Sequence, residues 1–297
     1  MKFLVTGGAG FIGSNLVEAL VREGHDAVVM DNIHSGNVKN LGNLDVGVIQ
    51  KSVGDIDASL DVDAIFHLGM PSSSPMYKKE PKLVGHVIND AIALFEFARQ
   101  KNCKVVFASS SSLYNGLEPP HRETMAIKVT DYYTEARLGV ERVAELYNKL
   151  YGVSSAAMRF FSVYGKNETS KGEYANIITQ FLWKMKNNEA PLVFGNGSQT
   201  RDFTYVDDVV SACRIAMDTK IGFDIFNVGT GRMTSFNEVV EILNRVLGKE
   251  IKPQYKQNPI KNYVADTQAD TTKARKILGF EAKISLEEGA KKLLKFY

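Results

Sequence analysis

Short apolar runs alternate with amphipathic segments through the first half of the chain. Six of these runs are apolar nearly throughout, and they cover residues 2–7, 26–31, 46–51, 63–69, 104–110 and 154–161. Between them, residues 13–24 and 87–102 carry apolar side chains at helical spacing. Strands that are apolar on both faces and alternate with helices indicate a parallel sheet covered on both sides. We therefore predict an α/β fold with a doubly wound parallel sheet, which binds ligands at the carboxyl ends of its strands.

The pattern changes after residue 165, where a polar, glycine-containing stretch interrupts the alternation. Apolar spacing then predicts helices at 175–188, 209–217 and 235–248 and a strand at 223–229. We predict a sheet domain over residues 1–165 and a smaller C-terminal α/β lobe over residues 166–297. The 204–230 stretch is expected to return to the main sheet.

Composition narrows the possible partners and the compartment. The net charge of +2 over 297 residues gives no broad basic field that would attract nucleic acid or a membrane surface. Cys103 and Cys213 form neither a metal-binding spacing nor a disulfide framework, so we expect a reducing compartment and no metal site. The N-terminal apolar run breaks at glycine after a few residues, too early for a signal peptide, and no later run reaches about 18 apolar residues. We expect a cytoplasmic protein.

A glycine-rich loop follows the first predicted strand directly. In TGGAGFIGSN, glycines stand at positions 7, 8, 10 and 13, and a helix opens near Phe11. Glycines at this place permit a tight turn and let the backbone approach a pyrophosphate, which the helix N-terminus stabilises. The loop therefore predicts a dinucleotide site.

The second strand ends at Asp31, 24 residues after Gly7, where a carboxylate can accept hydrogen bonds from the adenosine ribose. The same carboxylate would repel a 2′-phosphate, which favours NAD over NADP. A third strand is followed by GDI, whose Asp55 and Ile56 either flank the adenine or form a surface turn.

Two adjacent tyrosines begin a predicted helix near Asp131 in TDYYTEARLGVE. Tyr133 and Arg137 are four residues apart and share one helix face, whereas Tyr132 points about 100° away. A phenol is a poor base at neutral pH, and a fixed cation one turn away favours its deprotonated form. The Tyr133/Arg137 pair is either a surface feature of the helix or an acid/base in which the cation controls the protonation of the phenol.

These residues, in this order, resemble the extended short-chain dehydrogenase/reductase family, with its Rossmann domain, and within it the nucleotide-sugar epimerases of the UDP-galactose 4-epimerase type. The resemblance covers nearly the whole chain. It rests on the motifs GGAGFIGS, DAIFHLG, SSSSLY, YYTEARLGVE, RFFSVYG, GNGSQTRDFTYVDD and FNVGTG.

The resemblance implies catalytic roles for three residues. Members of the family carry Tyr-x-x-x-Lys with a glutamate eight residues after the tyrosine, and Glu141 selects Tyr133 as the acid/base. Arg137 stands in place of the family's lysine, which holds the nicotinamide ribose; arginine keeps the charge on a longer, planar group. Ser110 matches the serine that binds the sugar hydroxyl to be oxidised.

The resemblance also implies the remaining site residues. The cofactor, NAD, would be bound by Gly7, Gly10, Phe11, Ile12, Asp31, Asn32, Asp55, Ile56, Leu68, Asn89, Tyr133 and Arg137. A nucleotide sugar, with a UDP-sugar expected, would be bound by Ser72, Ser110, Ser111, Ser112, Tyr133, Ser162, Asn176, Arg201 and Lys261. Of these, Arg201 matches the family's diphosphate-binding arginine, and Ser162 replaces its usual asparagine.

The implied reaction is inversion of a sugar carbon through a transient 4-keto intermediate. Dehydratases and decarboxylases of the family place acidic residues just after the strand-end serine, where this chain has Ser111 and Ser112. Epimerisation of a UDP-hexose is therefore expected. The alternatives are a nucleotide-heptose 6-epimerase with Lys171 as a second acid/base, an oxidoreductase that releases NADH, and a catalytically silent NAD-binding sensor or scaffold. The family commonly dimerises through the helices matching 86–101 and 131–150, so a homodimer is expected.

Overall fold

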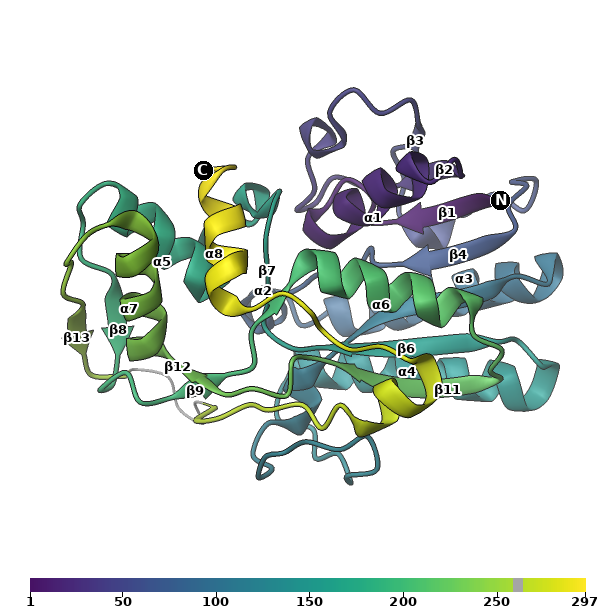
Figure 1. Ribbon diagram of the computed structural model, residues 1–297. Coiled ribbons are helices and arrows are strands. Elements are labelled where there is room, and N and C mark those ends of the chain that lie inside the picture. Colours follow the sequence, from purple (N-terminus) through teal and green to yellow (C-terminus); the bar gives the residue numbers. More distant parts are fainter. Residues whose placement is uncertain (259–263) are drawn as a thin grey trace.

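A seven-stranded parallel sheet forms the centre of the molecule in the computed structural model, which describes residues 1–258 and 264–297 (Figure 1). The strand order is β11-β6-β5-β4-β1-β2-β3. Its strands are β1 (Lys2–Thr6), β2 (Asp26–Met30), β3 (Gly47–Ile49), β4 (Ala64–His67), β5 (Lys104–Ser110), β6 (Ser155–Phe160) and β11 (Phe223–Val228). Every neighbouring pair is parallel, as the continuous apolar runs predict.

Helices cover both faces of this sheet. On one face, α1 (Phe11–Arg22) packs against α6 (Val206–Asp218); on the other, α3 (Leu83–Lys101) packs against α4 (Tyr132–Tyr151). Figure 1 shows α6 in front of the strands and α3 and α4 behind them. Each face has its own apolar core, the first including Leu16 and Val209 and the second Phe95 and Val140. The two cores confirm the predicted α/β, doubly wound class.

The chain changes direction between β1 and β4. From β1 it builds outward through β2 and β3, and it then crosses back to place β4 on the other side of β1. The connections leaving β1 and β4 therefore diverge, which opens a crevice at the carboxyl ends of these two strands. Any ligand of the sheet is expected in this crevice.

Residues after β6 build a second group of elements beside the sheet. The elements are β7 (Val163–Tyr164), α5 (Ile177–Lys186), β8 (Leu192–Phe194), β9 (Thr200–Arg201), β10 (Thr204–Tyr205), β12 (Thr234–Ser235), α7 (Phe236–Leu247), β13 (Gln254–Lys256) and α8 (Leu286–Leu294). A third apolar core, with Phe181, Leu243 and Leu293, holds α5, α7 and α8 together. Between β7 and β10 the chain forms α5, β8 and β9. It then returns to pair β10 with β7 and continues through α6 into β11 of the main sheet.

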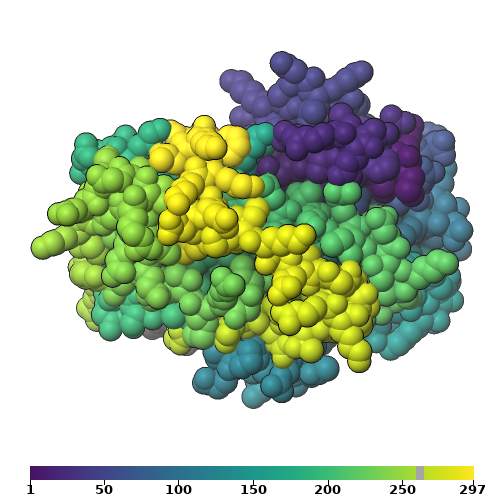
Figure 2. Space-filling view, viewed as in Figure 1, coloured from purple at the N-terminus to yellow at the C-terminus, as the bar shows by residue number. Residues whose placement is uncertain are grey.

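The C-terminal segment crosses both parts of the molecule. A π-helical turn, η5 (Ala274–Leu278), contacts α6 and β11, and α8 then packs on α5 and α7. Figure 2 shows this segment, in yellow, lying over the front of both parts.

Several predicted helix boundaries match the structure, and two helix starts differ: the helix predicted at 87–102 begins at Leu83, and the helix predicted at 209–217 also begins earlier. Asp131 caps α4 by accepting from the Thr134 backbone N–H at 2.8 Å, and Ser235 caps α7 in the same way through Glu238. The helix predicted at 209–217 begins earlier, at Val206, because Thr204 and Tyr205 pair with β7 and the helix starts immediately after them. No helix within the described ranges is long and apolar enough to cross a bilayer.

Candidate active site

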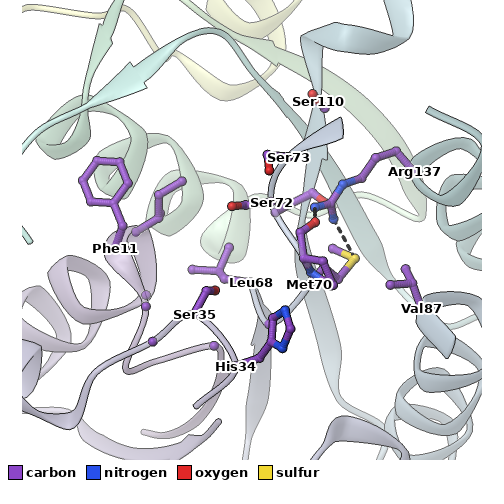
Figure 3. A pocket seen from close by; sticks show the side chains of 18 of the residues that line it. Phe11, His34, Ser35, Leu68, Met70, Ser72, Ser73, Val87, Ser110 and Arg137 are labelled. Atoms are coloured by element: carbon purple, nitrogen blue, oxygen red, sulfur yellow. Dashed lines mark hydrogen bonds between the residues drawn. The ribbon is translucent and has the colours of Figure 1, made fainter. Parts of the chain in front are cut away.

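A cavity of about 790 Å³ opens at the carboxyl ends of the central strands, in the crevice between β1 and β4 (Figure 3). Its walls come from the glycine loop, the segments after β2, β4 and β5, the start of α4, and the segment that leads into α5. The predicted residues that line it are Gly7, Gly10, Phe11, Ile12, Asp31, Asn32, Leu68, Ser72, Asn89, Ser110, Ser111, Ser112, Tyr133, Arg137, Ser162 and Asn176. The fold thus brings most of the predicted site residues to one cavity.

The glycine loop is shaped by a close backbone approach. Gly7 has φ +68°, and a Cβ on it would lie 2.6 Å from the backbone of Gly69, in the loop after β4. A Cβ on Gly13 would lie 2.0 Å from the Gly7 carbonyl oxygen. Helix α1 begins beside this loop at Phe11 with no side-chain cap, so its first N–H groups can receive a phosphate. This cradle fits the pyrophosphate of NAD.

Asp31 fixes the shape of the cavity beside the glycine loop. Its buried carboxylate accepts from the backbone N–H of Ala9 at 3.0 Å and of Ile33 at 2.8 Å. It therefore holds the glycine loop and the turn after β2 in place while lining the cavity. Ile33 has φ +59°, a left-handed conformation that is strained for a β-branched residue. Such strain is typical of backbone held in shape at a binding site.

Tyr133 and Arg137 lie together at the cavity wall. Tyr133 is 8% exposed and Arg137 only 4%, whereas Tyr132 is 51% exposed. The Arg137 guanidinium lies over the Tyr133 ring, 5.0 Å from its centroid. The structure thus separates the two tyrosines in the way that the helical period predicts.

Arg137 is held by neutral acceptors. Its guanidinium donates to Pro71 O at 2.8 Å and to the Met70 sulfur at 2.7 Å. Figure 3 shows the bond to Met70 as a dashed line. Its Nε has no hydrogen-bond partner, and within the described residues the side chain forms no ion pair. A buried cation without a carboxylate is costly, so it favours an electron-rich partner such as a phenolate or ligand hydroxyls.

Two further aromatic groups surround this cation. Burial, offset in part by Arg137, raises the pKa of Tyr77 to about 12, and the Tyr77 ring packs edge-on against Tyr133 at 5.5 Å. Burial, and then the charge of Arg137, lowers the pKa of His67 to about 3, so this imidazole is neutral at physiological pH. His67 ends β4, and its Nδ1 lies 2.7 Å from Thr6 Oγ1. The His67 and Tyr77 side chains around Tyr133 and Arg137 are thus uncharged at neutral pH.

Ser110 ends β5 and caps the short helix η3 (Ser111–Tyr114). Its hydroxyl oxygen accepts from the Ser112 backbone N–H at 3.1 Å and faces the cavity with Ser111 and Ser112. Residues 109–112 are all serines, so no side chain of this segment is acidic and none can serve as the acid of an elimination.

A buried network behind the cavity was missed as a functional feature by sequence reasoning. Glu141 on α4 pairs with Arg159 on β6 at 2.7 Å and accepts from Ser109 at the end of β5 at 2.5 Å. Arg159 also donates to the Tyr114 hydroxyl at 2.8 Å. These bonds fix α4 to the strand end that bears Ser110. The sequence signal was Glu141 itself, which was used only to align Tyr133.

The turn between β6 and β7 contributes Ser162 to the lining, and the second lobe contributes Lys171, Tyr174 and Asn176. Asn176 was expected to bind the nucleotide sugar. Its backbone N–H donates to the Glu168 carboxylate at 2.6 Å, and its side chain caps α5 through the N–H of Ile178. Ser162 has φ +29°, an uncommon conformation outside glycine.

Three predicted residues lie elsewhere, and one falls outside the described ranges. Asp55 and Ile56 are not part of the lining, whereas the buried Val53, two residues before Asp55, is. Arg201 on β9 does not line the cavity either, because its guanidinium donates to the carbonyls of Thr200 and Val264 and lies over the Phe236 ring. Lys261 belongs to residues 259–263, which the structure does not describe.

The fold and the cavity define a dinucleotide-dependent enzyme of the Rossmann class with a Tyr/Arg pair at its strand ends. Residues 3–229 match the NAD dependent epimerase/dehydratase family, and the chain belongs to that family. The predicted family, the cofactor NAD and the predicted class of enzyme are thereby confirmed.

Known relatives match over almost the full length. The crystal structure of the UDP-glucose 4-epimerase of Thermotoga maritima with UDP-glucose superposes with a TM-score of 0.94 at 33% identity, covering 100% of this chain and 98% of the other. The UDP-glucuronate 4-epimerase of Thermodesulfobacterium geofontis is 33% identical and covers 98% of this chain and 94% of its own. The UDP-glucose 4-epimerase of Mycolicibacterium smegmatis is 30% identical, with 100% and 97% covered.

Proposed function

We propose that this protein is an NAD-dependent UDP-hexose 4-epimerase. The observation that carries the proposal is the placement of Tyr133, buried at the cavity wall under the Arg137 guanidinium, in the same cavity as the hydroxyl of Ser110. The similarity to two UDP-glucose 4-epimerases supports the choice of substrate.

The two parts of the chain divide the binding task in this proposal. Residues 1–165, with the returning stretch 204–230, hold NAD through the glycine loop and Asp31. Residues 166–297, with the serines after β4 and β5, hold the nucleotide sugar. Bound NAD supplies the hydride acceptor that takes hydrogen from the sugar carbon and later returns it.

Residues of this chain accept the proton of the sugar hydroxyl and later return it. Tyr133, deprotonated beside Arg137, accepts the proton of the sugar hydroxyl, and Ser110 orients that hydroxyl by a hydrogen bond. When the hydrogen returns to the opposite face of the keto sugar, Tyr133 gives the proton back. Ser111 and Ser112 cannot abstract or donate protons near neutral pH, so the keto sugar is not diverted into elimination.

The proposal is tested by incubating the purified protein with UDP-glucose or UDP-galactose. We expect interconversion without net NADH, and Tyr133→Phe should abolish turnover while NAD stays bound. Steady accumulation of NADH would instead identify an oxidoreductase, and NAD binding without turnover on any nucleotide sugar would identify a sensor or scaffold. Full activity of Tyr133→Phe would remove the mechanism.

One observation favours a second candidate. Lys171 lines the cavity, as the second acid/base of a nucleotide-heptose 6-epimerase would. Turnover of an ADP-heptose, and none of UDP-hexoses, would establish that activity in place of the first.

The expected homodimer and the cytoplasmic location belong to the same proposal. Large apolar side chains, including Ile92, Leu146, Leu150 and Tyr151, are exposed on the neighbouring helices α3 and α4. Burying them against the same helices of a second copy would form a four-helix interface. Two buried free cysteines support a reducing compartment such as the cytoplasm.

A further inference from the structure

Lys171 faces the cavity from the second lobe. It belongs to the short helix η4 (Glu168–Tyr174), which leads into α5, and its side chain is 18% exposed. Its Nζ lies 5.5 Å from the ring centroid of Phe11, the first residue of α1. The lysine therefore stands between the segment that opens α5 and the N-terminus of α1.

The carboxylate beside Lys171, that of Glu168, accepts shorter hydrogen bonds from other donors than from this lysine. Glu168 is fully buried and accepts from the Asn176 backbone N–H at 2.6 Å and from Thr179 Oγ1 at 2.5 Å, whereas Lys171 Nζ lies 3.4 Å away. Burial raises the pKa of Glu168, and Lys171 opposes that rise. The Lys171 ammonium thus forms one long ion pair, with Glu168, and its other N–H groups remain able to donate to a ligand in the cavity.

The cavity offers few other cations to an anionic ligand. Counting lysines and arginines within the described ranges, Lys51 and Arg137 also line it. Lys51 follows β3, at the adenosine end, and Arg137 lies against Tyr133. The arginine expected to bind diphosphate, Arg201, donates to backbone carbonyls outside the lining. Among the described residues after position 165, Lys171 is the lysine or arginine that lines the cavity.

We propose that Lys171 binds the diphosphate of the nucleotide-sugar substrate. This inference rests on the proposed function for its substrate class, a nucleoside diphosphate sugar. A lysine ammonium binds phosphate as a compact point charge, and Glu168 limits where that charge can stand. The lysine acts in binding rather than in proton transfer.

The test measures nucleoside diphosphate affinity of the NAD-loaded protein by calorimetry. Lys171→Met should weaken UDP about tenfold or more and leave uridine unchanged, because it removes a charge-assisted contact to the diphosphate. Lys171→Arg keeps the charge and should stay within about twofold of the natural protein. Lys184→Met, an exposed lysine on α5, serves as the matched control and should change nothing. Glu168→Gln, which keeps Lys171, should leave UDP affinity intact or increased and controls for folding of this segment.

The other possible results of these measurements also decide whether Lys171 binds the substrate diphosphate. Unchanged UDP affinity in Lys171→Met overturns the proposal, as does a loss of kcat at unchanged affinity, which would identify proton transfer. Weakened NAD with unchanged UDP would assign the lysine to the cofactor's pyrophosphate and also overturns it. If UDP does not bind but ADP, GDP or dTDP binds in a Lys171-dependent way, the inference holds and the UDP-hexose assignment fails; binding of none of the four overturns the inference.

Discussion

Arg137 lies over the ring of Tyr133 at 5.0 Å, and the same guanidinium is tied to Pro71 O in the loop after β4. One side chain thus places a permanent positive charge against the phenol and fixes that charge to the cavity wall. Because the two residues are one helical turn apart on α4, their contact is built into the helix.

Removing this charge should impair catalysis more than binding. Arg137→Met is expected to lower kcat about 100-fold, because the proposed acid/base Tyr133 loses the cation that lies over its ring. Arg137→Lys keeps a cation and should retain activity within about tenfold. Steady-state kinetics over pH 6–10 measure both effects, and Arg142→Met, on the exposed side of the same helix, is the control. Equal kcat for Arg137→Met and the natural protein would contradict this role.

The buried Glu141–Arg159 pair should contribute strongly to stability. Glu141→Gln leaves the Arg159 guanidinium uncompensated in the interior, at a cost of about 3–5 kcal/mol in the free energy of unfolding. Glu145→Gln breaks an exposed pair with Lys149 on the same helix and should cost under about 1 kcal/mol. Urea titration at pH 7 measures both, and similar losses for the two variants would argue against the importance of burial.

His67 should make the protein sensitive to acid. Its pKa is about 3 in the folded protein, while an unfolded histidine titrates near 6.5. The folded state binds fewer protons between these values, so stability is full above pH 6.5 and falls on acidification by up to about 1.4 kcal/mol per pH unit. His67→Gln should lose stability less steeply than the natural protein from pH 7 to 4, measured by urea unfolding. The exposed His86→Gln should keep the natural slope; an unchanged slope in His67→Gln would refute the assignment.

The contact between Gly7 and Gly69 should be required for NAD binding. A Cβ at position 7 would lie 2.6 Å from the Gly69 backbone, so Gly7→Ala must displace the loop that receives the pyrophosphate. We expect NAD affinity, measured by calorimetry, to fall more than about tenfold, which is 1.4 kcal/mol. Gly24→Ala has a similar positive φ but no neighbour within 4 Å, and it should cost about 1 kcal/mol of stability without changing NAD affinity. Equal NAD affinity in both variants would exclude the steric explanation.

The exposed apolar face of α3 and α4 should mediate self-association. Leu150 is 66% exposed, and Leu150→Glu places a charge where the proposed four-helix interface would bury a leucine. We expect a dimer for the natural protein and a monomer for this variant by light scattering after gel filtration. Ile277→Glu, on the exposed turn η5, should leave the dimer intact. A monomeric natural protein would exclude the interface.

The fold could be predicted from the pattern of helices and strands because the sequence signals for these elements are local. The glycine loop, the apolar strands and the caps at Asp131 and Ser235 depend on backbone geometry within a few residues, and sequence reports them directly. The helical period placed Tyr133 and Arg137 on one face, whereas the choice of Tyr133 as acid/base came from the family's glutamate spacing, matched by Glu141. Arg201 was likewise placed by correspondence with the family, and Asp55 by its position after the third strand. The surroundings of both residues depend on distant segments that the local pattern does not describe.

The sequence by itself determined the parallel α/β architecture, the dinucleotide loop and the shared helix face of Tyr133 and Arg137, since each follows from short-range spacing. Only the tertiary structure decided which polar groups meet across the chain: Glu141 with Arg159, Gly7 with Gly69, and Lys171 with Phe11. The physical reason is that burial and long-range packing set these contacts, and both arise when strands and helices far apart in sequence close around one cavity.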